Sequence, residues 1–476
     1  MMKSEMHIEV SGLGAMKEAK FDVKPLTIVC GSNNMGKTYV TYALYGFLTF
    51  WRNVFALDVG EKYVNALVAK RQVVIPLAEC SKISTRLLET ASKAYSDPDV
   101  ISQVFGANSK LFKSVSFEAR VENFSIKTKE GDKFRNGTID AHDGIVLKWE
   151  FTDNELKILL YKSEQQVNRR IPHKWLLQRH LCSCFKQAFF DSVIPNPYIA
   201  CAERTGAVIF QKELDFTRNR MMELIKEDKV KNMPPFFRLL DDYSARYPSP
   251  IRNNVDVARE IPDGKESFLR KSQSVECKKI MELFCDIIGG EYKVVRGQAK
   301  FIPRGERAKS LDMILSSSSV RALMHLGVYL NFQAQPGDIF MMDEPEQNLH
   351  PENQRKMARL LALLSNVGVK VFITSHSDYI VREFNTLIML NGNTPQVGNI
   401  KSHFGYDASE RIEPDQIGVY CAMERMSVVR GSKHRCIYLE GKKIDSKIGV
   451  DADFFDGTIA SMNEIQDELR MDGAYD

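Results

Sequence analysis

Residues 31–38 read Gly31-Ser32-Asn33-Asn34-Met35-Gly36-Lys37-Thr38. This stretch fits the pattern G-x-x-x-x-G-K-[ST], which binds phosphate when it follows a strand and opens a helix. The sequence predicts both neighbours. Residues 26–30 form a short apolar run typical of a buried parallel strand. From residue 37 to about residue 51, apolar residues recur at helical spacing. We therefore expect a strand, a phosphate-binding loop and a helix in succession.

The residue types in this stretch suit a triphosphate. Small side chains let backbone N–H groups curl around phosphates, and the start of the following helix adds a positive dipole. Lys37 supplies a positive charge for the β- and γ-phosphates, and Thr38 offers a hydroxyl to Mg²⁺. The alternative is a glycine turn that holds no nucleotide, which the flanking strand and helix disfavour. We predict ATP and Mg²⁺ as the cofactors.

A second motif is an apolar stretch that ends in two acids, Ile-Phe-Met-Met-Asp-Glu-Pro at residues 339–345. Asp343 suits a metal ion or its bound water, and Glu344 suits the orientation of an attacking water. Buried acids at a strand end are costly unless a cation such as Mg²⁺ compensates them. A solvated turn would explain the pair in isolation. The phosphate loop earlier in the chain favours a single site with two halves.

Two further motifs each allow two interpretations. His376 lies in Ile-Thr-Ser-His-Ser at residues 373–377, at the end of the next apolar strand. It is either a structural histidine or a sensor of the γ-phosphate, and its position in the chain favours the sensor. The serines of the other motif precede an expected helix and form either a linker with a helix cap or an anion site. They are Ser316, Ser317, Ser318 and Ser319.

These four motifs occur in the order seen in ABC-type ATPases. The sequence resembles the branch of that family that includes SMC, RecF and OLD-like proteins. Two stretches look especially like the ATPase subunits of bacterial antiphage systems, those of Septu, retron-linked and PARIS-type defence. They are Asp-Glu-Pro-Glu-Gln-Asn-Leu-His-Pro at residues 343–351 and Thr-Ser-His-Ser-Asp at residues 374–378. The resemblance covers about residues 20–50 and 310–390.

The resemblance implies a role for each residue of the nucleotide site. Lys37 and Thr38 correspond to the phosphate and metal contacts. Asp343 corresponds to the acid on the metal side, and Glu344 to the hydrolytic carboxylate. His376 resembles the switch histidine of the family.

The resemblance also implies that two chains share ATP. Asn348 resembles part of a loop that crosses the dimer interface, and Ser316–Ser319 resemble the signature that clamps the partner's nucleotide. We therefore expect a homodimer or higher homo-oligomer in which the phosphate loop of one subunit faces the signature of the other. The serines lack the glycines usual in transporter signatures, so we expect hydrolysis that is slow or depends on a partner.

The implied fold is of the α/β class: an ABC-type ATPase head, that is, a P-loop NTPase with a mixed, mostly parallel sheet. The alternation of apolar strands and helices supports this class. The expected segments are core lobes at 1–51 and 291–395, a core strand at 196–204, an α+β insertion at 52–195, a helical insertion at 205–290, and an accessory C-terminal appendage at 396–476 with one strand near 435–439.

The composition, 44% hydrophobic and 26% charged, is ordinary for a globular protein. No apolar run approaches the length of a membrane span, and the N-terminus lacks a signal-peptide core. The nine cysteines form no regular framework, which favours reduced thiols. We expect a cytoplasmic protein with no membrane partner.

The net charge of +4 neither demands nor excludes nucleic acid as a partner. A basic cluster before the serine motif is either a contact for a phosphate backbone or solvated surface. Its residues are Arg296, Lys300, Arg304, Arg307 and Lys309. Glu203 and Arg204, after an expected strand at 198–201, lie either near the nucleotide or in a surface ion pair.

Two functions remain open at this level. The first is an ATPase subunit of a bacterial antiphage defence complex that dimerises around ATP and controls a separate effector, a nuclease or toxin. The separate effector is expected because no nuclease, protease or transferase site is recognisable in the sequence. The second is a RecF/SMC-like DNA-repair ATPase that binds DNA directly. A scaffold that binds ATP without hydrolysis fits the serine-only signature but conflicts with Glu344.

Overall fold

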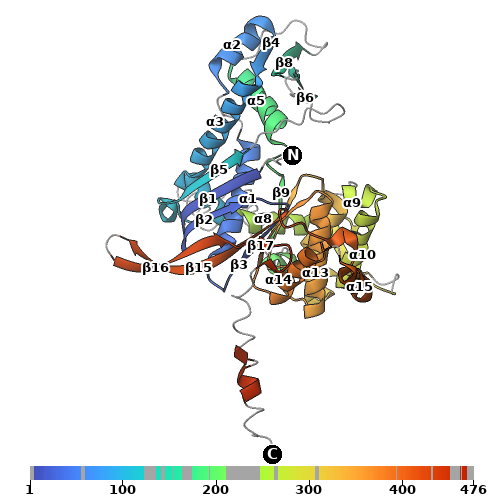
Figure 1. Ribbon diagram of the computed structural model, residues 1–476. Coiled ribbons are helices and arrows are strands. Elements are labelled where there is room, and N and C mark those ends of the chain that lie inside the picture. The colour runs from blue at the N-terminus through green and yellow to red at the C-terminus, as the bar shows by residue number, and fades with distance from the viewer. Residues whose placement is uncertain are drawn as a thin grey trace, which may run out of the picture.

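The computed structural model places a large central sheet among helices, with a smaller α+β unit above it in the view of Figure 1. The residues it describes are 5–54, 59–122, 136–140, 145–152, 154–162, 174–191, 193–210, 247–261, 266–305, 310–392, 394–429, 432–450, 461–462 and 464–468.

The central sheet has nine strands in the order β5-β1-β2-β16-β15-β3-β14-β13-β9. The strands are β1 (Glu5–Leu13), β2 (Met16–Asp22), β3 (Leu26–Cys30), β5 (Ser116–Glu122), β9 (Pro197–Ala200), β13 (Ile339–Asp343), β14 (Lys370–Ser375), β15 (Ile417–Val429) and β16 (Ser432–Gly441). From β15 to β9, all neighbouring strands run parallel. β1 pairs antiparallel with both β2 and β5. The predicted α/β class with a mixed, mostly parallel sheet is confirmed.

The adjacency of β3, β14 and β13 brings three of the sequence motifs to one edge of the sheet. The parallel register pairs Cys30 with Ser375 and Asp343 with Thr374. Each of these strands then ends, and the chain passes directly into the phosphate loop, Glu344 or His376. Because parallel strands present their carboxyl ends at a common edge, motifs separated by hundreds of residues become neighbours.

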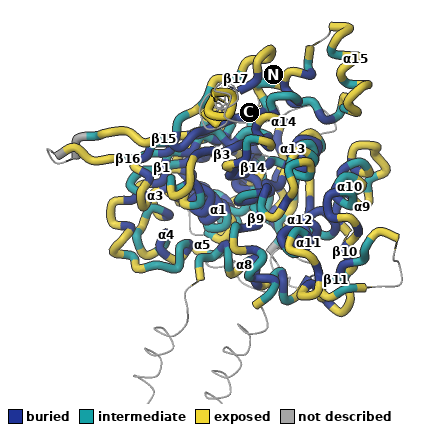
Figure 2. The backbone as a smooth tube through the Cα atoms, turned by 90° about the horizontal axis from the view of Figure 1, so that it is seen from below, coloured by how far each residue is buried: buried dark blue, intermediate teal, exposed yellow. Residues whose placement is uncertain are grey.

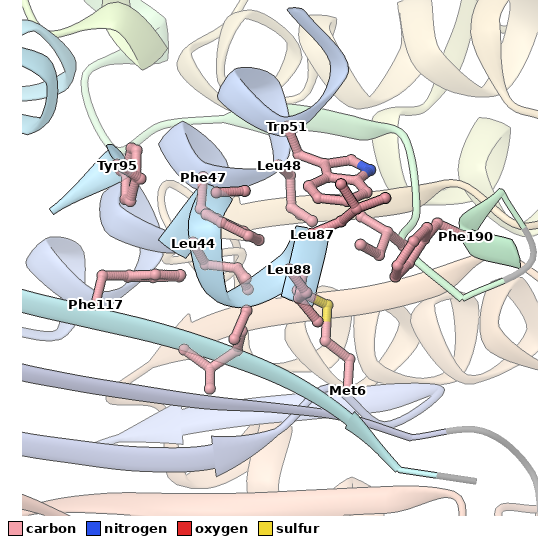
Figure 3. Packing of buried hydrophobic residues seen from close by; sticks show 14 of the residues in the cluster. Met6, Leu44, Phe47, Leu48, Trp51, Leu87, Leu88, Tyr95, Phe117 and Phe190 are labelled. Carbon is pink, nitrogen blue, oxygen red and sulfur yellow. The ribbon is translucent and has the colours of Figure 1, made fainter. Parts of the chain in front are cut away.

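Helix α1 (Lys37–Asn53) covers one face of this sheet and begins at the phosphate loop. Its buried side chains include those at the predicted helical spacing: Val40, Leu44, Phe47, Leu48 and Trp51. Figure 3 shows this helix packing toward α3 (Leu77–Tyr95) and the β1–β5 part of the sheet. The Phe47 ring stacks on Phe117 of β5 with ring centroids 4.7 Å apart. Because burying each such side chain contributes on the order of 2 kcal/mol, the helix is anchored along its length.

The opposite face of β3, β13 and β14 packs against a second core. Strand alternation divides the side chains: Ile339 and Met341 face the α1 side, whereas Phe340 and Met342 face the second core. The helix expected after the serine motif is interrupted at Leu323 and ends in the π-helical turn Tyr329–Gln333. The helices of this lobe are α8 (Ser249–Arg259), α9 (Phe268–Lys271), α10 (Val275–Ile288), α11 (Ser318–Ala322), α12 (Met324–Val328), α13 (Pro351–Asn366), α14 (Asp378–Met389) and α15 (Pro395–Phe404). Its small sheet contains β10 (Gly290–Val295), β11 (Gln298–Pro303) and β12 (Leu311–Asp312).

The segment predicted as an α+β insertion contains a separate antiparallel sheet, β4-β8-β7-β6. Its strands are β4 (Gln72–Pro76), β6 (Asn136–Asp140), β7 (Ile145–Phe151) and β8 (Glu155–Lys162), with helices α2 (Glu61–Lys70), α4 (Pro98–Phe105) and α5 (Lys174–Phe185). The insertion predicted at 52–195 includes β5, but β5 belongs to the central sheet. It pairs with β1 from Glu5↔Glu122 to Ser11↔Ser116. This pairing is non-local, so the alternating pattern of β5 alone does not identify its partner.

The expectation of an accessory appendage at 396–476 is wrong for residues 417–441. These form the hairpin β15–β16, which is inserted into the main sheet between β3 and β2. β15 pairs with β3 from Ile417↔Leu26 to Cys421↔Cys30. Beyond that register the hairpin extends out of the body as two long strands (Figure 1). The sequence predicts one strand here, near 435–439, and misses β15.

All nine cysteines are free thiols, as the sequence predicts. Within the described ranges, no helix combines the length and the apolar character needed to cross a membrane. The burial pattern follows the two cores, with buried segments in the sheet and exposed segments at the periphery (Figure 2).

Candidate nucleotide-binding site

The phosphate loop turns from β3 into α1 through backbone angles that favour glycine. Gly31 has φ 141° and Gly36 has φ 77°. A Cβ at Gly31 would also lie 3.0 Å from the Ala422 Cβ of the hairpin, so a side chain there would crowd β15. Asn34, with φ 64°, tolerates the left-handed region better than most residues do. The spacing of small residues in the motif thus matches the backbone path.

Lys37 is folded back over the loop. Its Nζ donates hydrogen bonds to the carbonyl oxygens of Gly31 and Ser32, both at 2.8 Å. Burial lowers the pKa of this ammonium, and the nearby Glu344 carboxylate opposes that shift. Around it, Ser32, Asn33 and Asn34 are exposed, while the side chains of Met35 and Thr38 are half-buried. The loop thus presents exposed polar residues beside a pre-positioned cation.

Asp343 is the most enclosed acid of the site, with no exposed surface. Its Oδ1 accepts a hydrogen bond from the Thr374 hydroxyl at 2.9 Å, whereas its Oδ2 has no hydrogen-bond partner among the described residues. Burial raises the pKa of this carboxyl to about 7, although the hydroxyls of Thr374 and Thr41 oppose the shift. A buried carboxylate oxygen without a partner suits a hard cation, and the Thr38 hydroxyl supplies a second oxygen on the adjoining loop. The residues present therefore fit Mg²⁺.

Glu344 adopts an unusual backbone conformation, with φ 49°. Its N–H donates to the carbonyl oxygen of Thr374 at 3.0 Å, which fixes the turn at the end of β13. Such a conformation costs a non-glycine residue on the order of 1 kcal/mol and is often found at functional sites. Its side chain is 33% exposed, in contrast to the enclosed Asp343, and so can contact water.

His376 lies beside this acid. Its Nδ1 is 3.8 Å from Glu344 Oε1 and 3.4 Å from Glu346 Oε1. Glu346 is nearly buried and accepts hydrogen bonds from the Ser375 hydroxyl at 3.1 Å and the His376 N–H at 2.8 Å. Burial raises the pKa of Glu346, and the His376 N–H opposes the shift. The sequence prediction omits Glu346, although its place in Asp-Glu-Pro-Glu provides a signal.

Arg204 is not in the surface ion pair that the sequence allows as one alternative. Its side chain is fully buried, and its guanidinium binds backbone carbonyl oxygens in place of a surface acid. Two of these carbonyls belong to Asp343 and Glu344. Glu203 is exposed and accepts a hydrogen bond from the Tyr42 hydroxyl at 3.2 Å. The surface ion pair is therefore excluded.

The serine motif lies in a different environment. Ser317 caps α11, because its hydroxyl accepts a hydrogen bond from the Val320 N–H at 3.3 Å. Ser316 is buried and donates to the Asp312 carbonyl, and the hydroxyls of Ser317 and Ser319 are 3.0 Å apart. Ser317 and Ser318 are exposed. In the described part of the chain, no hydrogen bond joins this motif to residues 31–38.

Asn348 is exposed in the turn that follows the acidic pair, and its φ of 61° again requires the left-handed region. The turn is held by hydrogen bonds from the Gln347 N–H to the Glu344 carbonyl and from the Leu349 N–H to the Glu346 carbonyl. Its position at the carboxyl edge suits a contact outside the chain. Contact with a second subunit stays a prediction.

The basic cluster before the serine motif is largely neutralised where the structure describes it. Lys300 pairs with Asp312 at 3.0 Å and Arg304 pairs with Asp286 at 3.1 Å. Arg307 and Lys309 lie outside the described residues. Contact with nucleic acid therefore stays a prediction.

Comparison with known proteins supports an ATPase. Residues 316–381 match a family model described as an AAA ATPase domain. That range contains the serine motif, both acids and His376, while the phosphate loop precedes it. Among curated proteins, the ABC multidrug transporter H of Aspergillus fumigatus is 27% identical over 161 residues. The match covers 29% of this chain and only 11% of the transporter.

The chain is also similar to solved SMC head domains, each at 11% identity. An SmcHead bound to the C-winged helix domain of ScpA has a TM-score of 0.32, with 90% of this chain and 97% of that chain covered. The SMC head domain from Thermotoga maritima has a TM-score of 0.28, with 91% and 98% covered. The Smc head domain from Pyrococcus furiosus, bound to the C-terminal domain of ScpA, has a TM-score of 0.31, with 98% and 100% covered.

Proposed function

We propose that this protein binds and hydrolyses ATP at a site that two copies complete by pairing head to tail. The observation that carries the proposal is the convergence of Lys37, Asp343, Glu344 and His376 at one edge of the sheet, from three strands that the sequence separates widely. The ATPase match over residues 316–381 supports the same chemistry.

Each residue at this edge has a role that its environment supports. Lys37 would bind the β- and γ-phosphates with the ammonium that now contacts loop carbonyls. Asp343 and Thr38 would hold Mg²⁺, which when bound neutralises phosphate charge. Glu344 would orient and polarise the attacking water with its partly exposed carboxylate. His376 lies where it can sense the γ-phosphate, and Glu346 holds its backbone in place.

The exposed surface of the serine motif supports the head-to-tail pairing. Ser317 and Ser318 are exposed, and their hydrogen bonds are confined to their own segment. Ile314 and Leu315 beside them are 54% and 73% exposed. An apolar pair next to exposed hydroxyls is suited to contact with another surface. A second copy would place these serines against the nucleotide of the first.

We further propose that ATP binding in this dimer controls a separate effector, a nuclease or toxin, in a bacterial antiphage defence complex. This part rests on the resemblance of residues 343–351 and 374–378 to the ATPase subunits of such systems. A protein that couples ATP to a partner needs surfaces beyond its active site. The β15–β16 hairpin, which is rooted at Gly31 and extends outward, is such a surface.

The test is to compare the wild-type protein with Glu344→Gln, using Glu413→Gln, an exposed acid away from the site, as the matched control. Glu344→Gln should lower ATP hydrolysis by about 10²–10⁴-fold while ATP still binds, because the water-orienting carboxylate is lost. The same proteins would then be purified from their native host and their partners identified by mass spectrometry.

Recovery of a nuclease-like or toxin-like protein, enriched with Glu344→Gln, is the expected result. Recovery of the chain alone, together with ATP-dependent binding to DNA, would replace effector control with the DNA-repair function. Unchanged hydrolysis in Glu344→Gln would overturn the assignment of the site itself.

A further inference from the structure

A single buried arginine joins the two halves of the proposed site. Arg204 follows β9 and has no exposed surface. Its Nη1 donates to the carbonyl oxygens of Asp343 at 2.6 Å and Cys201 at 3.0 Å, and its Nη2 donates to that of Glu344 at 2.8 Å. Its Nε donates to the carbonyl oxygen of Ala322, at the end of the serine helix α11, at 2.7 Å.

Burial of this guanidinium is costly, and burial lowers its pKa. In the described residues its hydrogen bonds go only to carbonyl oxygens, so the charge is balanced by dipoles and by the nearby acids of the site. An apolar side chain at this position would leave buried carbonyl oxygens without partners, and each buried group left so is destabilising. Arg204 therefore contributes to stability, and the test of its role in the site has to separate the two effects.

The bonded carbonyls explain what the arginine can do. The planar fork holds both peptide oxygens at the turn where Glu344 has φ 49°, and thereby sets the direction of the Glu344 side chain. The same rigid group is bonded to α11. A shift of α11 must either break the bond to Ala322 or move the guanidinium against the Asp343 and Glu344 carbonyls.

We propose that Arg204 is a positioning residue that couples engagement of the serine motif to the orientation of Glu344. Contact of Ser316–Ser319 with the partner's nucleotide shifts α11, and the guanidinium carries that shift to the peptide of Glu344. Hydrolysis in each chain is thereby linked to the occupancy of the neighbouring site. This inference rests on the proposed function, and it adds a route for communication between the two sites.

The test is a double-mutant cycle on steady-state ATP hydrolysis that combines Arg204→Lys with Ser318→Ala. Lysine keeps the positive charge but cannot reach carbonyls on three segments at once. Arg204→Lys should lower kcat by about 10–100-fold, since misplacement of a catalytic group by about 1 Å has effects of this size. The KM for ATP should change little, because Lys37 and the phosphate loop are untouched. Ser318→Ala should lower kcat by about tenfold.

If Arg204 carries the coupling, the double variant loses little more than the larger single loss. The control cycle pairs Ser318→Ala with Arg359→Lys, which alters an arginine that bonds to Gly405 and Glu410 away from the site. That cycle should show no loss from Arg359→Lys, alone or in combination. Multiplicative losses in the Arg204 cycle would overturn the coupling, as would a rise in KM with kcat unchanged.

Folding and function can be separated in this experiment. If Arg204→Lys does not fold, Arg204→Gln, whose amide donates without a buried charge, takes its place in the cycle. Loss of the fold in both variants assigns Arg204 a structural role and overturns the proposal. Absence of Lys37-dependent hydrolysis in the wild-type protein is a different result, because it contradicts the proposed function and not only the coupling.

Discussion

The phosphate loop and the serine motif both expose small polar residues, yet only the phosphate loop lies beside the charged side chains of the proposed site. The phosphate loop is backed by β15, and its Lys37 bonds to carbonyls of its own loop, close to the buried Asp343. The serine motif projects Ser317 and Ser318 into solvent beside two exposed apolar residues. The comparison shows that the charged residues of the proposed site are assembled within one chain, whereas Ser317 and Ser318 are exposed and, among the described residues, form hydrogen bonds only within their own segment.

The largest effect is expected when the phosphate loop is altered. Lys37→Ala removes the only side-chain charge of the motif at residues 31–38, so ATP hydrolysis should fall by about 10²–10³-fold and ATP binding should weaken. Hydrolysis and nucleotide binding by calorimetry are the two measurements. Lys293→Ala, which changes an exposed lysine of β10, is the matched control and should behave like the wild type.

A smaller and different effect is expected when the serine motif is altered. Ser318→Arg places a bulky cation on the proposed contact surface, so pairing should weaken and hydrolysis should fall by about 10–100-fold. Binding of ATP to the single chain should persist, because the phosphate loop is separate. Equal loss of ATP binding in Ser318→Arg and Lys37→Ala would contradict the separate roles of the phosphate loop and the serine motif.

The two variants together provide a sharper test of pairing. In a head-to-tail dimer of one Lys37→Ala chain and one Ser318→Arg chain, one site carries both defects and the other carries neither. A mixture of the two variant proteins should therefore recover up to roughly a quarter of wild-type hydrolysis if the chains exchange freely, and less if Arg204 couples the intact site to the empty one. No recovery, despite exchange shown by labelled subunits, would argue against a shared site.

The smallest effect on hydrolysis is expected behind the serine motif, at His325 of α12. This side chain is fully buried and contacts the Asn254 carbonyl at 2.9 Å through Nε2. Burial lowers its pKa from 6.5 to about 4, the contact with Asn254 opposes the shift, and the charge of Arg204 adds to it. As pH falls from 6.5 to about 4, the unfolded chain takes up this proton first, so stability is lost in that window.

The contribution of His325 to this loss is about 3 kcal/mol. His325→Gln should therefore have a free energy of unfolding that depends less on pH between 6.5 and 4, as measured by urea unfolding at several pH values. Hydrolysis at neutral pH should remain close to that of the wild type. An identical pH dependence in both proteins would show that His325 does not titrate in this way.

Local pattern predicted the elements at the site with good accuracy. The apolar run at 26–30 is β3, residue 37 begins α1, and the acids at 343 and 344 follow a buried strand. These features depend on hydrophobic periodicity and on turn chemistry, and both are visible in residues that are neighbours in the sequence. The sites for ATP, Mg²⁺ and the signature remain predictions that the experiments above address.

The sequence by itself thus determined the class of fold, and it predicted the residues that we propose carry the chemistry. Tertiary structure decided which strands are neighbours, and so placed β5 and the β15–β16 hairpin in the main sheet. It also decided that Arg204 is buried against four carbonyl oxygens and that Glu346 holds the backbone of His376. The physical reason is that strand pairing and most of these buried hydrogen bonds join residues that are distant in the sequence, and local periodicity contains no information on the partner.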